Sequence, residues 1–182
     1  FGTFPSRVGA WAMTGMLSAL GFLGPMAALT AGSLAVLAIG MGNRSSRPSA
    51  RLPKAVAVAA VLLALALGAA APEAARPPLF RFDMLGGAMQ LVFLAAALPL
   101  LYLMSPSDEA PPALVLGSLL GMALVAASGN LLALFIGLEL MSIPAYLLVA
   151  RSRCAQALEA AVKYFFAGGA AGAFFLMGMA LH

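Results

Sequence analysis

The chain has 182 residues, of which 63% are hydrophobic and only 9% are charged, and its mean hydropathy is +1.03. A soluble domain carries about 25% charged residues, so this composition excludes a water-facing surface of the usual kind. The apolar runs are long and continuous, whereas the strands of a membrane barrel alternate over about ten residues. The sequence therefore predicts an all-α fold, a polytopic transmembrane helical bundle.

Charge and cysteine usage exclude other classes of protein. The formal net charge is +4, but the arginines lie in the gaps between apolar runs, where topology signals belong, so nucleic acid is not expected as a partner. Cys154 is the only cysteine in the sequence, which rules out a disulfide within it. No Cys/His metal box, nucleotide loop or haem motif occurs. We therefore expect no cofactor or metal in this chain, and a lipid bilayer around it.

Residues 1–12 precede the first long apolar run. The sequence does not begin with methionine, and Met13 or Met16 would make a natural start. We expect residues 1–12 to be a non-native or interfacial leader, and the sequence to be a fragment of a longer protein.

Six membrane helices of about 20 residues each follow from the apolar runs. The first has Pro25 in its opening turns, and the second can start at Pro53 because proline suits the first helical position. A very tight turn at Gly129 and Asn130 joins the fourth helix to the fifth. The six helices are expected at about Leu20 to Met41, Pro53 to Ala71, Met84 to Met104, Ala113 to Ser128, Asn130 to Ala150, and Ala155 to Leu181.

Positive charges in the loops predict the orientation. The loops after the first, third and fifth helices hold most of them, namely Arg44, Arg47, Arg51, Lys54, Arg151 and Arg153. The other side holds only Arg76, Arg81 and Arg7. Because cytoplasmic loops are enriched in lysine and arginine, the N-terminus is expected outside and the hairpin between helices five and six in the cytoplasm.

Small residues at four-residue spacing predict close helix contacts. Gly117 and Gly121 have this spacing in the fourth helix, and Gly168 and Gly172 have it in the sixth. The pattern is common in polytopic proteins, so it indicates packing and no particular function.

Two ionisable residues interrupt the last two apolar runs. Glu139 lies near the middle of the fifth helix, and Lys163 lies in the first half of the sixth. A charged side chain at the bilayer centre costs about 2.5 to 3.5 kcal/mol on insertion scales, so such residues indicate function. Glu139 is roughly 16 Å from the cytoplasmic end of its helix and Lys163 roughly 13 Å from the start of the next. We therefore expect the two groups at similar depth on antiparallel neighbours, able to pair and to pass protons.

Polar residues around this pair suggest a path. Ser142 and Tyr146 share a helix face with Glu139, and Pro144 leaves a backbone carbonyl without its helical donor. On the sixth helix, Gln156 and Glu159 lead towards Lys163. An alternative stays open, because Glu159 and Lys163 form an i, i+4 pair in the favourable order and Lys163 could extend towards the interface.

Two stretches resemble a known family. They read "GNLLALFIGLELMSIPAYLLVA" at residues 129–150 and "LEAAVKYFFAGGAAGAFFLMGMAL" at residues 158–181. Together they look like the fifth and sixth helices of the subunit N family of NADH-quinone oxidoreductase, one of the antiporter-like membrane subunits of respiratory complex I. The GLEL-S-P-Y and E-A-A-x-KYF patterns at this separation carry the resemblance.

The resemblance implies roughly fourteen transmembrane helices with inverted repeats of about five helices. Residues 13–110 would then be peripheral helices one to three, and 111–182 would begin the proton-translocating repeat with helices four to six, cut short. Glu139 resembles the family's fifth-helix glutamate and Lys163 its sixth-helix lysine. The family moves protons through such groups, coupled to quinone reduction elsewhere in the complex.

The resemblance also implies an enzyme subunit with no redox centre of its own. NADH, FMN, iron–sulfur clusters and quinone would act in other subunits. The partners would be other membrane subunits of complex I, including neighbouring antiporter-like ones, in the bacterial plasma (inner) membrane.

Two other functions stay open. A multi-subunit cation/proton antiporter shares the glutamate and the lysine, although the E-A-A-x-KYF stretch favours the respiratory subunit. A structural membrane subunit without proton traffic is the other alternative.

Overall fold

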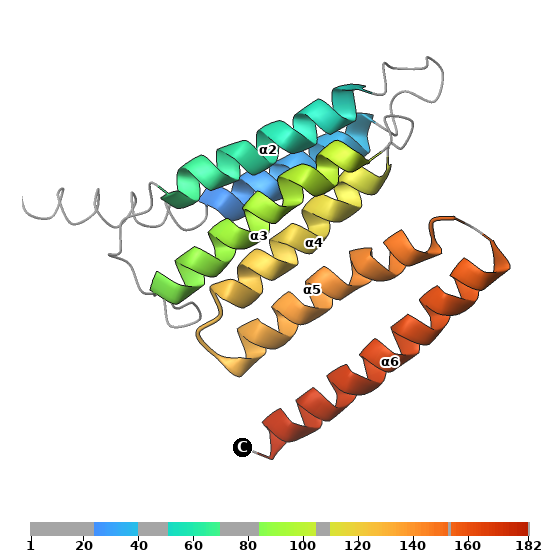
Figure 1. Ribbon diagram of the computed structural model, residues 1–182. Coiled ribbons are helices and arrows are strands. Elements are labelled where there is room, and N and C mark those ends of the chain that lie inside the picture. The colour runs from blue at the N-terminus through green and yellow to red at the C-terminus, as the bar shows by residue number, and fades with distance from the viewer. Residues whose placement is uncertain (1–23, 40–50, 70–83, 105–109, 153, 182) are drawn as a thin grey trace, which may run out of the picture.

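The computed structural model describes residues 24–39, 51–69, 84–104, 110–152 and 154–181. Six helices occupy these ranges, and Figure 1 labels five of them. Their bounds are Gly24–Ile39, α2 Arg51–Ala69, α3 Met84–Leu103, α4 Ala110–Ala126, α5 Leu131–Ala150 and α6 Ala155–Ala180. Each lies on one of the six predicted runs, so the all-α fold class is confirmed. The predicted leader 1–12, and most of the loops whose charges predict the orientation, lie outside the described residues.

Three of the described helices, α3, α5 and α6, are long and apolar enough to cross a membrane. Shorter apolar stretches are Gly24–Ile39, Leu52–Leu67 and Pro112–Ala126. Many large apolar side chains also point outwards, as they do where lipid replaces water. The chain is therefore a multi-pass membrane protein.

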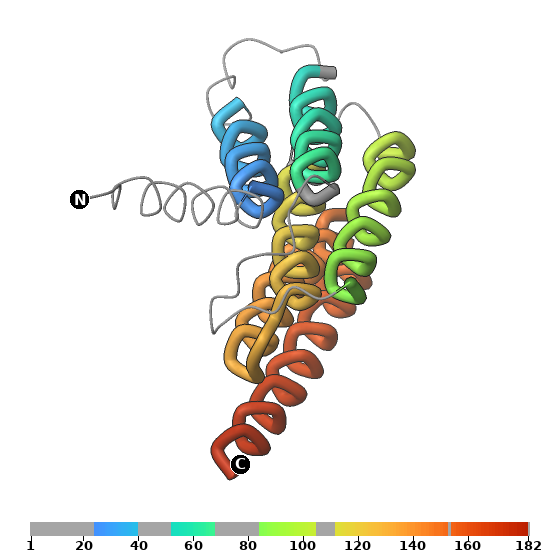
Figure 2. The backbone as a smooth tube through the Cα atoms, turned by 90° about the vertical axis from the view of Figure 1, so that its left-hand side faces the viewer, coloured from blue at the N-terminus to red at the C-terminus, as the bar shows by residue number. Residues whose placement is uncertain are grey.

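The buried core lies where the first four described helices meet (Figure 2). Its largest fully buried side chains include Leu29 of the helix Gly24–Ile39, Leu94 and Leu101 of α3, and Leu116 of α4. At Gly32 the helix Gly24–Ile39 comes against Ala60 of α2, and Leu116 of α4 lies close by. Lipid gives little hydrophobic drive for helix association, so close packing through small residues holds these helices together.

Lys54 joins α2 to the end of α3. Its Nζ donates to the carbonyl of Tyr102 at 2.6 Å and to that of Met104 at 3.0 Å, and it lies 5.4 Å from the centroid of the Tyr102 ring. The last carbonyls of a helix lack partners within the helix and carry partial negative charge. A lysine at this position supplies both the missing donors and the opposite charge.

The α4–α5 hairpin is the most closely packed pair. Asn130 accepts a hydrogen bond from the backbone N–H of Ala133 at 2.8 Å and so caps the start of α5, where the tight turn was predicted. Gly121 lies directly against the backbone of Met141, and a methyl group added at Gly117 would be 3.2 Å from the ring of Pro144. The close contact predicted from the spacing of Gly117 and Gly121 is confirmed, and its partner is α5.

Candidate functional site

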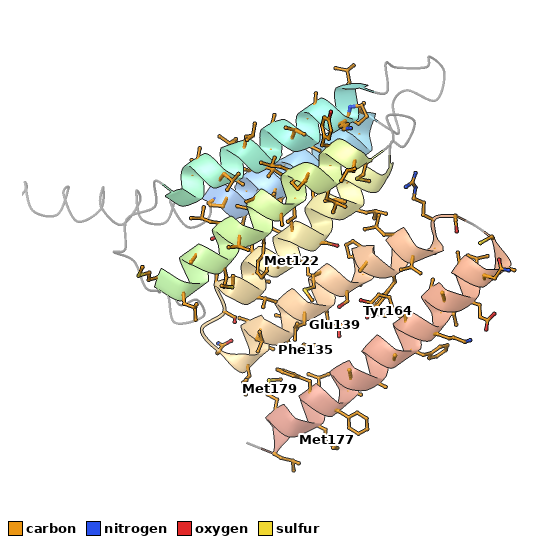
Figure 3. The ribbon with its side chains drawn as sticks, in the orientation of Figure 1. Met122, Phe135, Glu139, Tyr164, Met177 and Met179 are labelled. Atoms are coloured by element: carbon orange, nitrogen blue, oxygen red, sulfur yellow. The ribbon has the colours of Figure 1, made fainter. Side chains whose placement is uncertain are left out.

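Glu139 lies on the face of α5 that meets α6. A methyl group added at Gly172 of α6 would be 2.8 Å from Glu139 Oε1 and 3.6 Å from the ring of Phe135. Figure 3 shows Glu139 and Phe135 projecting from α5 towards α6, with Tyr164 reaching back from α6. The half-buried carboxylate therefore lies between two helices.

Aromatic contacts on either side of Glu139 join the same two helices. The rings of Phe135 and Phe175 stack with their centroids 5.8 Å apart. Tyr146 makes edge contacts with Tyr164 at 4.8 Å and with Phe165 at 5.8 Å between centroids. Glu139 lies between these aromatic groups, one turn of α5 from the first and about two turns from the second.

Two polar side chains of α5 pack against Gly168 and Gly172 of α6. The hydroxyl of Tyr146 lies directly against Gly168, just as the carboxylate of Glu139 lies against Gly172. The close contact predicted from the spacing of these two glycines is confirmed, and it involves polar atoms of the predicted site.

The contacts between α5 and α6 set a register that the sequence did not reveal. Glu139 is opposite Gly172, and Tyr146 is opposite Phe165 and Gly168. Lys163 is then opposite about Leu148, roughly 13 Å along the helix axis from Glu139. The expectation that the two groups share a depth is wrong, because α6 has 26 residues against 20 in α5 and extends past the C-terminal end of α5 (Figure 1).

Lys163 also points away from α5. The residues of α6 that touch α5 share one face, and at 3.6 residues per turn Lys163 is about 150° around the helix from that face. Its Nζ lies 2.5 Å from Glu159 Oε1, and the two side chains are 74% and 64% exposed. The structure therefore pairs Lys163 with Glu159, the alternative left open by the sequence, and does not bring it to Glu139. The exposed Gln156 begins α6 on the same outer face.

The hydroxyl groups of two serines donate hydrogen bonds to backbone carbonyls near Pro144. The hydroxyl of Ser142 donates to the carbonyl of Leu138 at 2.6 Å, within α5. The hydroxyl of Ser118 on α4 donates to the carbonyl of Met141 at 3.2 Å, one residue beyond Leu140, whose helical donor Pro144 cannot supply. Sequence reasoning missed Ser118, although a serine between Gly117 and Gly121 on a close-packed face was a usable signal.

Cys154 forms the N-cap position of α6, at the hairpin outside the apolar helices. It is exposed, and its Sγ lies 3.4 Å from the hydroxyl of Ser152. The side-chain hydrogen bond with Ser152 lowers the pKa of the Cys154 thiol from its ordinary value of 9.0, and the backbone of Ala157 acts in the same direction. No cluster of three or more His, Cys, Asp or Glu that could hold a metal ion occurs in the described ranges.

Comparisons with known proteins agree with this arrangement. Residues 128–182 match the family described as "NADH:quinone oxidoreductase/Mrp antiporter, TM". NADH-quinone oxidoreductase subunit N from Geobacillus kaustophilus is 35% identical over 161 residues, which cover 82% of this chain and 32% of that protein. Subunit N 1 from Symbiobacterium thermophilum is 35% identical over 168 residues, which cover 86% of this chain and 34% of that protein.

A solved structure extends the comparison to the fold. A chain of respiratory complex I from Thermus thermophilus with bound aureothin aligns with a TM-score of 0.75 and 33% identity, over 86% of this chain and 36% of that one. The protein is thus an all-helical membrane protein of the kind found in the membrane part of complex I. In particular, the chain is a partial homologue of NADH-quinone oxidoreductase subunit N, and it spans about a third of the length of the relatives it matches. The family resemblance predicted from residues 129–181 is confirmed.

Proposed function

We propose that this chain is part of a proton-translocating membrane subunit of NADH:quinone oxidoreductase. The observation that carries the proposal is the carboxylate of Glu139, held between α5 and α6 in a homologue of subunit N. NADH, FMN, iron–sulfur clusters and quinone act in other subunits of the complex, and this chain supplies a path for protons.

Glu139 is the proposed proton-carrying group of the described helices. Ionisable residues inside a membrane are rare because their insertion is costly, and they mark ion pathways. The hydroxyl of Tyr146 reaches the same α5–α6 interface two turns away, towards the hairpin of Cys154. Protons would enter or leave along this side of α5, with Ser142 and Tyr146 as supporting polar groups.

Lys163 and Glu159 form the second proposed proton site, on the outer face of α6. A charged pair within a membrane helix faces the interior of a bundle or a water-filled cavity. The relatives are about three times as long as this chain, so further helices of the whole protein would cover this face. Gln156 would connect it to the cytoplasmic hairpin, and α6 would stand between the two sites.

The proposed orientation places the N-terminus outside and the α5–α6 hairpin in the cytoplasm of a bacterial cell, in the plasma membrane. In the whole protein, residues 13–110 would form the peripheral helices, and 111–182 would begin the proton-translocating repeat. The neighbouring antiporter-like subunits of complex I would be its partners.

Labelling of Cys154 tests the orientation. In inverted vesicles, a membrane-impermeant maleimide is expected to modify the Cys154 peptide of the full-length protein, as measured by mass spectrometry. Because the thiolate is the reactive form and the thiol pKa is lowered, the rate should reach half its maximum below pH 9.0, and Ser152→Ala should move this midpoint upwards. Labelling in right-side-out vesicles alone would reverse the proposed orientation.

Purification of the full-length protein tests the function. A tagged copy is expected to co-purify with subunits that oxidise NADH. When the purified assembly is placed in liposomes and supplied with NADH and quinone, the pH inside the liposomes should fall. The second candidate is the antiporter, since the matched family also includes Mrp antiporters. Co-purification without NADH-oxidising subunits, together with sodium-dependent proton exchange, would replace the proposal with that candidate.

A further inference from the structure

The carboxylate of Glu139 fills the space that a side chain at position 172 would occupy. A methyl group on Gly172 would lie 2.8 Å from Oε1 and 3.9 Å from Cδ of Glu139. Its other neighbour is the ring of Phe135, at 3.6 Å, one turn earlier on α5. The side chains of Glu139 and Phe135 on α5 therefore lie against a glycine of α6.

Two other glycines of α6 make no such contact. A methyl group at Gly169 or Gly178 would meet nothing within 4 Å in the part of the chain that the structure describes. The contacts therefore separate Gly168 and Gly172, which lie against polar atoms of α5, from Gly169 and Gly178. At position 172, an added methyl group would meet a carboxylate oxygen of Glu139, the ionisable group of the proposed proton path.

The surroundings of the carboxylate restrict where it could move. Along the helices, the stacked pair of Phe135 and Phe175 lies on one side of the carboxylate, and the contacts of Tyr146 with Tyr164 and Phe165 lie on the other. A methyl group at position 172 would push the carboxylate along this interface or out of it. Proton transfer is sensitive to such shifts, since a misplacement of about 1 Å can lower a rate by about 100-fold.

We propose that Gly172 is a positioning residue, which holds the carboxylate of Glu139 at one place between α5 and α6 by leaving room for it. The proposal rests on the proposed function, in which Glu139 carries protons. It assigns to Gly172 a role beyond close packing: its lack of a side chain decides where the proton-carrying group lies.

Gly172→Ala in the full-length protein tests this role. NADH oxidation with an artificial electron acceptor should stay unchanged, since that reaction belongs to other subunits, and NADH-driven proton pumping should fall by at least about tenfold. Gly169→Ala is the matched control on the same helix and should pump like the wild type. Pumping by Gly172→Ala at the wild-type rate would overturn the proposal.

A compensating change separates positioning from packing. Glu139→Asp shortens the side chain by one methylene and should relieve the clash, so Gly172→Ala should lower pumping by a smaller factor in the Glu139→Asp background than in the wild type. The same comparison applies if Gly172→Ala lowers the amount of assembled complex, because relief by Glu139→Asp still identifies the carboxylate as the obstructed group. Absence of relief in either case would overturn the proposal and leave a packing role.

The Glu139→Gln variant distinguishes failure of this inference from failure of the proposed function. If Glu139→Gln pumps normally, the proposed function fails, and the inference fails with it. If Glu139→Gln abolishes pumping while Gly172→Ala pumps normally, only the positioning role is overturned.

Discussion

Replacing Glu139 with glutamine is expected to lower NADH-driven proton pumping strongly while the complex still assembles. Glutamine keeps the shape of the side chain beside Gly172 and Phe135, so the α5–α6 contact should survive. It cannot ionise at any pH of interest, and a positioned acid–base group contributes about 100-fold or more to proton transfer. We therefore expect pumping to fall by at least about tenfold. Fluorescence quenching of a pH-sensitive dye in inverted vesicles measures the rate of NADH-driven proton pumping.

The controls for this variant separate function from assembly. NADH oxidation with an artificial acceptor, and the amount of complex on a native gel, should match the wild type. Glu139→Asp keeps an ionisable group and should retain more pumping than Glu139→Gln. A wild-type ratio of protons pumped to NADH oxidised in Glu139→Gln would instead favour a structural membrane subunit without proton traffic.

Gly121→Ala is expected to have the largest effect on stability. A methyl group at this position would collide with the backbone nitrogen and Cα of Met141 on α5. Backbone cannot rotate away as a flexible side chain can, and overpacking costs about 1–3 kcal/mol even where side chains adjust. The α4–α5 hairpin should therefore separate or shift, and the hydrogen bond from Ser118 to the carbonyl of Met141 should be lost.

The amount of full-length protein in the membrane, and its melting temperature in detergent, measure this effect. Gly87→Ala on α3 makes the same chemical change where no described atom lies within 4 Å of the added methyl, and it should leave both quantities near the wild type. Equal melting temperatures for the two variants would show that the α4–α5 contact is less important than the structure indicates.

The sequence alone determined the class of fold and the positions of the helices. Length and composition of an apolar run are local properties, and each predicted run carries a described helix. The turn at Asn130, and the pairing of Glu159 with Lys163 that the sequence left open as an alternative, are also local, because both depend on residues three or four positions apart. The position of Glu139 near the middle of a membrane helix could be read in the same way.

Only the tertiary structure decided what Glu139 faces. The register between α5 and α6 depends on how Phe135 meets Phe175 and how Tyr146 meets Phe165, which helix periodicity does not encode. Counting residues from the hairpin assumed that both helices end at the same level, whereas α6 extends past α5. Close side-chain packing between helices selects one axial position among several that the apolar pattern allows. In the selected position, Gly172 lies beside Glu139 and Lys163 lies away from Glu139.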